Sequence, residues 1–289
     1  MAITASMVKE LRERTGLGMM DCKKALTEAD GNMELAIENL RKSSALKAAK
    51  KAGRTAADGL LGLKVAADGS RAALVEVNIE TDFAAKNEKF IAYVGKVTDT
   101  LFDDAAGDLA GIMAAGLEAE RETLVQEIGE NISVRRGEVF ATDGGYIASY
   151  LHSNKRQGAL VELSEANAEL GKDLAMHVTA MNPLVVKSDD VPAETVAKER
   201  EIFAAQAAES GKPTEIVEKM VEGRVRKYLA EVSLVDQPFV KDSGTKVGQL
   251  LKDAGADCRR IVRFEVGEGI EVAEEDFAEE VRKQIEGDD

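Results

Sequence analysis

The period with which apolar and polar residues alternate changes along the chain, and these changes predict separate structural units. In residues 1–54, apolar residues recur at helical spacing in three short stretches, each preceded by a residue that can cap a helix. Gly16 can end the first stretch in the left-handed conformation. We therefore predict a three-helix bundle over residues 1–54, with N-caps at Thr4, Asp21 and Asn32.

Two methionines are expected in the loop between the first two of these helices. Met19 and Met20 follow Gly18, and such flexible thioethers suit an adaptable contact surface, although packing inside the bundle is the alternative. Lys23 lies close to them in the sequence. Further along, Lys47–Arg54 is basic, rich in alanine and short of large apolar residues, so we interpret it as a frayed helix or linker.

Beyond residue 55 the sequence contains a weak internal duplication, in which corresponding residues stand 86 positions apart. Asp58–Leu61 aligns with Gly144–Ile147, and Ala73–Val77 aligns with Ala159–Leu163. Each copy has the pattern of a strand, a turn, a second strand and a helix. We therefore predict two related α+β subdomains, the first over residues 55–140 and the second over 141–189 and 233–266.

The two copies differ at the corner where the second strand meets the helix. In the first copy an apolar strand runs into Thr81, Asp82 and Phe83 before helical spacing resumes. Such a corner can present a carboxylate beside a large ring to another molecule; the alternative is a capped helix whose Phe83 packs inward. The second copy has Ala166–Glu169 at this place, so the shared scaffold does not require Asp82 or Phe83.

Residues 190–232 contain two charged helical patterns, Val191–Glu209 and Thr214–Glu231, separated by a break at Ser210–Pro213. Two helices with so short a connection are expected to form an antiparallel hairpin. Its apolar residues can pack within the hairpin or against another molecule; they are Val196, Phe203, Ile216, Met220, Val221 and Tyr228. The last unit, residues 267–289, is predicted to carry an acidic helix from Glu274 to about Ile285.

Charge and composition narrow the class of function. The chain of 289 residues has a net charge of −15, while residues 1–54 hold eleven basic and seven acidic residues. An acidic body repels phosphate backbones, so a protein partner is favoured over nucleic acid. No stretch has the ~20 apolar residues of a membrane span. Charged residues begin at Lys9, so the N-terminus lacks the apolar core of a signal peptide. We therefore expect a cytoplasmic protein without membrane contact.

The sequence carries no signature of catalysis or of a bound cofactor. It lacks the GxxxxGK[ST] and GxGxxG phosphate loops, the HExxH metal motif and the GxSxG nucleophile motif. Cys22 and Cys258 are expected to be free thiols, and His152 and His177 are too few to complete a zinc site. We predict no enzymatic activity, no cofactor and no resident metal, and either histidine can have a structural or a direct role.

Six segments form a pattern that covers nearly the whole chain, in the order Leu11–Leu26, Glu76–Phe83, Ile128–Ile132, Tyr150–His152, Ala175–Val178 and Phe264–Gly269. Together they resemble the bacterial translation elongation factor Ts family, the guanine-nucleotide exchange factors of elongation factor Tu. Ile79 and Ala84 depart from the residues usual in that family. The resemblance implies an α+β protein with an N-terminal bundle of the ubiquitin-associated type, a duplicated core, a helical hairpin for dimerisation and a C-terminal helix that contacts the partner.

The resemblance also implies which residues meet elongation factor Tu. The corner, with Thr81, Asp82, Phe83 and Ala84, is expected to insert beside the partner's magnesium site, displace magnesium and promote GDP release. Other implied contacts are Met19, Met20, Lys23, Ile128, Gly129, Asn131, His152 and Val240. A passive chaperone-like or ribosome-associated interaction protein is the alternative hypothesis.

Overall fold

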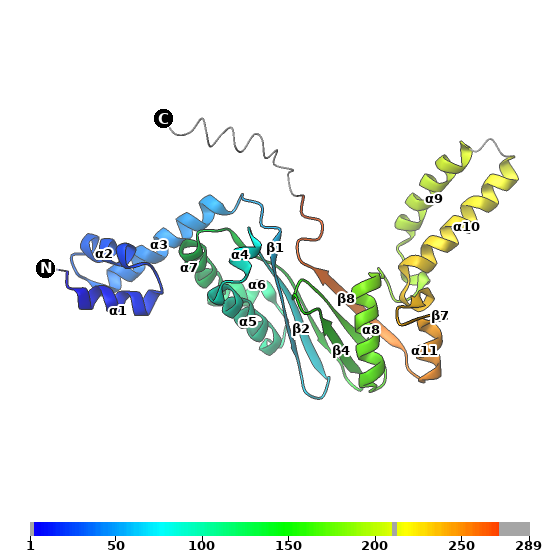
Figure 1. Cartoon of the computed structure of the whole chain (residues 1–289), viewed down its shortest axis with the longest axis horizontal. Coiled ribbons are helices and arrows are strands. Elements are labelled where there is room, and N and C mark those ends of the chain that lie inside the picture. The colour runs from blue at the N-terminus through cyan, green and yellow to red at the C-terminus, as the bar shows by residue number, and fades with distance from the viewer. Residues whose placement is uncertain (1–2, 210–212, 272–289) are drawn as a thin grey trace.

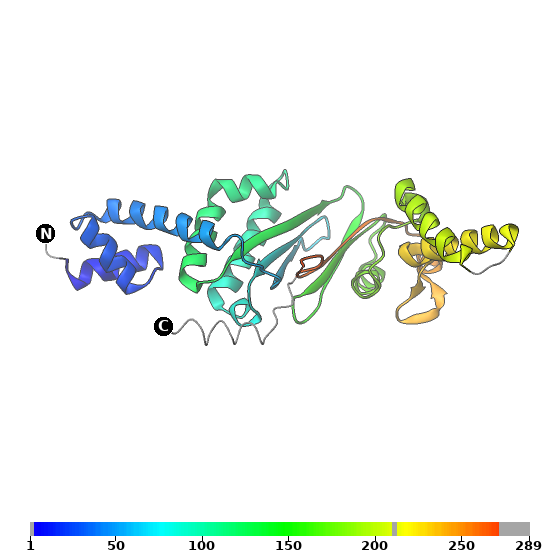
Figure 2. The same ribbon diagram turned by 90° about the horizontal axis from the view of Figure 1, so that it is seen from above.

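The computed structural model describes residues 3–209 and 213–271. The molecule is elongated, with a small helical bundle at one end, two sheets in the middle and a helical hairpin at the other end (Figure 1). Turned by 90°, the same arrangement shows the sheets between the helices that cover them (Figure 2). The predicted α+β class is confirmed. The domain boundaries given above stay predictions.

The N-terminal bundle consists of α1 (Ala5–Thr15), α2 (Met19–Glu28) and the longer α3 (Met33–Lys51). The Thr4 and Asn32 side chains cap α1 and α3 as predicted, because each accepts a hydrogen bond from a backbone N–H in the first turn. Gly16 ends α1 with a φ of 72°, as expected. The bundle has its own apolar core around Leu11 and Leu26.

Two predictions about α2 are wrong. Gly18, not Asp21, is the N-cap of α2, so Met19 and Met20 lie in the first helical turn rather than in a loop. Glycine is acceptable at an N-cap, and an aspartate within the first turn is favoured by the helix dipole. For Lys47–Arg54 the structure favours the helix over the linker: α3 continues to Lys51, because alanine has the highest helix propensity and Ala48 is buried in the core of the first sheet.

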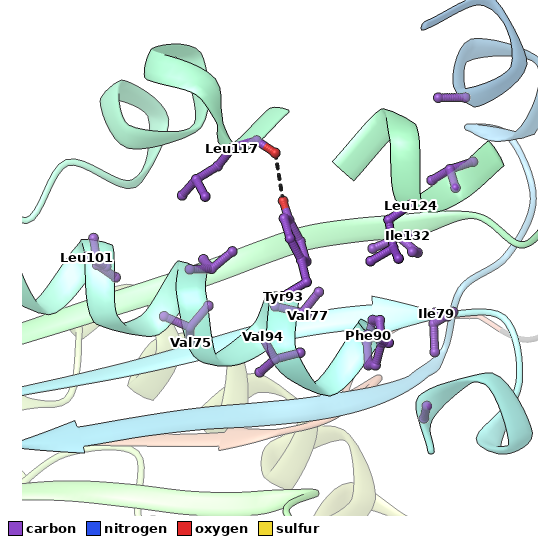
Figure 3. Close-up of a cluster of buried hydrophobic side chains, with 14 of the residues drawn as sticks. Val75, Val77, Ile79, Phe90, Tyr93, Val94, Leu101, Leu117, Leu124 and Ile132 are labelled. Carbon is purple, nitrogen blue, oxygen red and sulfur yellow. Dashed lines mark hydrogen bonds between the residues drawn. The ribbon is translucent and has the colours of Figure 1, made fainter. Parts of the chain in front are cut away.

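The first sheet has the order β1-β2-β3, with all pairs antiparallel. Strand β2 is buried on both faces, since one face meets the helices and the other meets the second sheet. Figure 3 shows the helical side, where Phe90 and Tyr93 pack among strand residues and the Tyr93 hydroxyl donates to the Leu117 carbonyl at 3.0 Å. The strands are β1 (Asp58–Val65), β2 (Arg71–Ile79) and β3 (Ile132–Ala141); the helices are α4 (Asp82–Ala85), α5 (Glu88–Asp103), α6 (Leu109–Ile112) and α7 (Glu118–Ile128), with a π-turn, Met113–Leu117, before α7.

The second sheet repeats this plan with the order β4-β5-β8, again antiparallel. Helix α8 packs on β4 and β5 as α5 packs on β1 and β2. The two sheets share an apolar cluster that includes Leu74 from one and Leu160 from the other. The elements of this half are β4 (Tyr146–Leu151), β5 (Gln157–Leu163), α8 (Ala168–Met181), β6 (Pro238–Phe239), β7 (Asp242–Lys246), α11 (Val247–Asp253) and β8 (Cys258–Glu265), with short 3₁₀ turns at Ser188–Asp190 and Leu234–Asp236. Strands β6 and β7 form a separate two-stranded antiparallel sheet.

Each hairpin turn reaches across to the first strand of the other copy. The Ile147 N–H donates to the Gly69 carbonyl at 2.8 Å, and the Leu61 N–H donates to the Lys155 carbonyl at 2.7 Å. These two bonds correspond under the 86-residue offset of the duplication. The copies are therefore joined reciprocally, and the β4–β5 turn lies beside the first half of β1.

The helical hairpin consists of α9 (Ala193–Ala208) and α10 (Thr214–Val232), which pack against each other. Val196, Phe203 and Val221 pack in its small core, whereas Ile216 is exposed. Some of the predicted apolar residues therefore pack within the hairpin, and at least one faces outward. Of the predicted break at Ser210–Pro213, residues 210–212 lie outside the described residues, and Pro213 is the N-cap of α10. The predicted C-terminal helix lies outside the described residues. Within those residues, no helix is long and apolar enough to cross a membrane.

Candidate functional site

The corner after β2 presents its side chains outward. Thr81 caps α4, because its hydroxyl oxygen accepts a hydrogen bond from the Ala84 N–H at 3.2 Å. The Phe83 ring is 82% exposed, so the alternative in which this ring packs inward is wrong. Ala85 alone in this turn is buried, and it anchors α4 to the core of the first sheet. An exposed phenylalanine on a rigid scaffold is typical of a residue that serves a partner.

Lys86 lies over both side chains at the tip. Its Nζ is 2.7 Å from the Asp82 carboxylate and 5.4 Å from the centre of the Phe83 ring. The hydrogen bond from Lys86 is the largest cause that lowers the pKa of Asp82 below its ordinary value, and the charge of Arg156 adds to it. Asp82 is therefore ionised near neutral pH and can meet a cation or a hydrogen-bond donor.

The base of the corner is held by the loop between α7 and β3. Both oxygens of the Glu130 carboxylate accept from Thr81, one from its N–H at 3.0 Å and one from its hydroxyl at 2.8 Å. In the reverse direction, the Asn131 N–H donates to the Glu80 carboxylate at 2.5 Å. The buried Asn131 amide donates to the Arg54 carbonyl at 2.8 Å. Asn131 therefore ties three segments together inside the protein.

The turn between β4 and β5 lies close to the corner. Arg156 pairs with Asp58 at the start of β1. His152, in the same turn, is exposed, and its Nδ1 lies 3.2 Å from the Asn154 side-chain oxygen. The structure thus brings a residue of the second copy, Arg156, within electrostatic reach of Asp82.

The other predicted contact residues are distributed along the molecule. Met19 and Met20 are exposed on α2, as is Lys23 beside them. Ile128 packs partly against the core of the first sheet, and Gly129 ends α7 with a φ of 89°, so only Gly129 needs its residue type for the backbone. Val240 is exposed in the turn between β6 and β7.

His177 has a structural role in this fold. Its side chain is completely buried; Nδ1 accepts from the Val240 N–H at 3.1 Å, and Nε2 lies 2.9 Å from the Gln237 side-chain oxygen. Burial lowers the pKa of His177, so the ring is neutral near pH 7 and donates from Nε2. The histidine therefore fixes the Val240 turn without facing solvent.

The described residues contain no group of three or more His, Cys, Asp or Glu side chains that could hold a metal ion. Cys22 and Cys258 are buried free thiols, as expected, and burial raises the pKa of Cys258 to about 12. A thiol with so high a pKa is a poor nucleophile at neutral pH.

Three residues of the corner were missed by sequence reasoning: Glu80, Lys86 and Glu130. Lys86 stands four residues after Asp82 on a helix, a spacing that favours an ion pair, so this contact could have been found. Glu130 acts on Thr81 from 49 residues away, and no local pattern signals that contact.

Comparisons with known proteins agree with the pattern of motifs. A family model described as Elongation factor TS matches residues 80–268, starting at the corner. The proteins named Elongation factor Ts from Hahella chejuensis and Saccharophagus degradans are 58% identical over 286 residues and 57% identical over 285 residues. These alignments cover 99% of this chain and 99% and 98% of those two proteins. The protein of the same name from Marinobacter nauticus is 57% identical over 280 residues, which are 97% of this chain and 96% of that protein. The chain therefore belongs to the elongation factor Ts family.

Proposed function

We propose that this protein releases GDP from elongation factor Tu by inserting the corner Thr81–Ala84 beside the partner's magnesium site. Membership of the family assigns the chain to translation elongation as a nucleotide exchange factor of elongation factor Tu. The proposal adds which residues act and how they act. The observation that carries it is Phe83, which is 82% exposed just beyond a strand that is buried from Ala72 to Ile79.

The physical basis is competition for the groups that hold the nucleotide. A bound guanine nucleotide depends on Mg²⁺ and on backbone N–H groups around its phosphates. A ring wedged beside these groups, with the ionised Asp82 next to it, shifts the elements that support both magnesium and phosphate. No covalent bond is made or broken. The coupling is reciprocal, so GDP weakens the binding of the exchange factor by the same factor.

The remaining contact residues extend the interface along the molecule. We infer that two exposed regions meet the partner on either side of the corner. One is the bundle, with Met19, Met20 and Lys23, and the other is the turn between β6 and β7, with Val240. Flexible methionines adapt to a surface at low cost. In this proposal Asn131 serves the interface indirectly, because its side chain is buried beneath the corner.

The decisive experiment measures GDP release from elongation factor Tu by stopped flow, with the wild-type protein and with Phe83→Ala. An exposed ring contributes little to folding, so the melting temperature should stay within about 2 °C, which is less than ~1 kcal/mol. Stimulated release should fall about tenfold if the ring supplies ~1.4 kcal/mol of differential binding. Phe90→Ala, at a buried ring in the same part of the fold, should instead destabilise the protein by about 3 to 5 kcal/mol.

The same assay separates the alternative hypotheses. A passive chaperone-like or ribosome-associated protein would leave the rate of GDP release unchanged at substoichiometric amounts. Normal exchange by folded Phe83→Ala would exclude the insertion of the ring, although nucleotide exchange by the family would stand.

A further inference from the structure

The corner is a four-residue helix that local interactions alone do not stabilise. A single helical turn is unfavourable by itself, because several backbone angles are fixed in exchange for one hydrogen bond. In α4 only Ala85 is buried, and Asp82 and Phe83 point to solvent. The orientation of the ring therefore depends on the hydrogen bonds at the N-terminus of the turn.

Those hydrogen bonds form a short relay that ends at Glu130. The Ala84 N–H donates to the Thr81 hydroxyl oxygen at 3.2 Å, and this hydroxyl donates in turn to Glu130 at 2.8 Å. Because the proton of the Thr81 hydroxyl points to the carboxylate, a lone pair of the hydroxyl oxygen faces the Ala84 N–H. The second oxygen of Glu130 fixes the Thr81 N–H at 3.0 Å. One carboxylate thus sets both the cap and the backbone from which Phe83 extends.

Glu130 is itself held in place by the segment that follows α3. Lys51 donates to the Gly129 carbonyl, and the Asn131 side chain donates to the Arg54 carbonyl at 2.8 Å. The residues on both sides of Glu130 are therefore anchored, and its carboxylate has a fixed position.

The second copy of the duplication provides an internal comparison. The paired arginines of β3 and β8, Arg136 and Arg260, stand 124 positions apart, so Ala254 occupies the place of Glu130. At the 86-residue offset, Ala166 occupies the place of Glu80. Asn167, in the place of Thr81, still caps a helix by accepting from a backbone N–H at 3.1 Å. A helix cap at this position therefore needs no carboxylate beside it.

We propose that Glu130 is a positioning residue for nucleotide exchange, which holds Thr81 so that Asp82 and Phe83 are presented to elongation factor Tu in one orientation. This inference rests on the proposed function of the corner. The copy without the Asp-Phe pair has alanine where the first copy has Glu130, whereas the capping side chain is present in both. When these side chains are already fixed in the free protein, less conformational entropy is lost on binding, so the complex with elongation factor Tu is stronger.

The test is a double-mutant cycle measured by GDP release from elongation factor Tu. Glu130→Ala alone should reduce stimulated release about fivefold, the size expected when an interface side chain loses its fixed orientation. Glu130→Gln should lie between this variant and the wild type, since one amide oxygen can still accept from the Thr81 hydroxyl. Glu120→Ala removes a carboxylate and an ion pair from α7, the helix that precedes Glu130, and should leave release unchanged.

The cycle distinguishes positioning from other roles of Glu130. In a Phe83→Ala and Asp82→Ala background, Glu130→Ala should cause no further loss, because the side chains it orients are gone. An equal loss in both backgrounds would overturn the proposal and indicate a direct or general structural role. Amide hydrogen exchange gives a second readout: Ala84 should exchange faster in Glu130→Ala while the buried amide of Val97 on α5 keeps its protection. Unchanged protection at Ala84 would likewise overturn it.

A failure of this inference differs from a failure of the proposed function. If Phe83→Ala reduces release and Glu130→Ala does not, Glu130 has no positioning role and the corner keeps its function. If neither variant affects release, the insertion of the corner itself is excluded.

Discussion

The two copies of the duplicated core share their buried architecture and differ at their surface. In the first copy Glu76 is completely buried and pairs with Arg135 and Arg136. In the second copy Glu162, at the corresponding position, pairs with Arg259 and Arg260. Each glutamate precedes an irregularity in strand pairing, between Glu76 and Val77 or between Glu162 and Leu163.

The arginines also connect the copies to each other. The Cζ atom of Arg136 lies 4.2 Å from the centre of the Phe264 ring on β8, and the Cζ atom of Arg260 lies 3.8 Å from the centre of the Phe140 ring on β3. Their guanidinium groups also donate to backbone carbonyls of the opposite copy, those of Glu265 and Ala141. The reciprocal contacts occur in both directions, so they belong to the fold.

The corner does not follow this symmetry. Thr81, Asp82 and Phe83 with the carboxylate of Glu130 occur only in the first copy, and the second copy carries the helical hairpin instead. What is repeated therefore holds the sheets together, and what is unique is available for partners. This distinction can be tested from both sides.

The largest effect is expected at the repeated glutamates. Glu76→Ala leaves Arg135 and Arg136 without their shared carboxylate and should cost about 3 kcal/mol of unfolding free energy. Glu162→Ala should cost less, because both of its arginines are more exposed. Urea denaturation of the variants measures both values. Glu138→Ala, on the exposed side of β3, is the matched control and should change stability by less than ~0.5 kcal/mol.

A comparable loss in the control would mean that the buried pairs do not distinguish scaffold from surface. GDP release per folded molecule should remain near normal in Glu162→Ala, since the corner lies in the other copy. A large loss there would break the division between the copies.

The same glutamates predict a dependence of stability on pH. Burial alone would raise the pKa of Glu76, but hydrogen bonds from the Gly267 N–H, Asn78 and Arg136 outweigh it and lower the pKa. A lowered pKa in the folded state stabilises the protein above the ordinary glutamate pKa of about 4.3, and this stability is lost as the pH falls below that value. Urea midpoints between pH 7 and pH 3 should therefore fall less steeply for Glu76→Gln than for the wild type. Parallel curves would contradict the assignment.

A moderate effect is expected from the charge of the bundle. Lys23→Glu should slow association with elongation factor Tu about threefold at low salt and flatten the salt dependence, because charges at an interface rim act mainly on encounter. Stopped-flow association over a range of ionic strengths measures both. Lys42→Glu makes the same charge change on α3, where the lysine pairs with Glu38, and is the control. Equal effects of the two variants would indicate net charge rather than a docking face.

The smallest effect on exchange is expected from removal of the hairpin. Its base is closed by a parallel bridge between Val185 and Ser233, and the Leu184 N–H donates to the Val232 carbonyl at 2.8 Å. Replacing residues 191–231 by a short flexible linker should therefore keep the second sheet folded and GDP release within about twofold of the wild type. The resemblance implies that the hairpin serves dimerisation, and this variant lacks its exposed Ile202 and Ile216, so we expect sedimentation to show weaker self-association. A folded variant without exchange activity would give the hairpin a role in exchange.

The sequence by itself determined the elements whose signals are local. Thr4, Asn32 and Gly16 mark helix ends through contacts within one turn, and these predictions are confirmed. The duplication predicts two strand–turn–strand–helix units, and comparison of the copies singles out Asp82 and Phe83, which the structure shows to be exposed. Local signals also misled at α2, where Gly18 rather than Asp21 caps the helix.

Tertiary structure alone decided which distant residues support these elements. Glu130 reaches Thr81 across 49 positions, and Arg136 reaches the Glu265 carbonyl across 129. Such contacts leave no periodic trace, because they depend on how sheets and loops pack rather than on neighbouring residues. Asn131 illustrates the consequence: the resemblance implied a partner contact for it, whereas packing buries its amide beneath the corner. The chain thus specifies the corner locally, and the fold fixes its orientation.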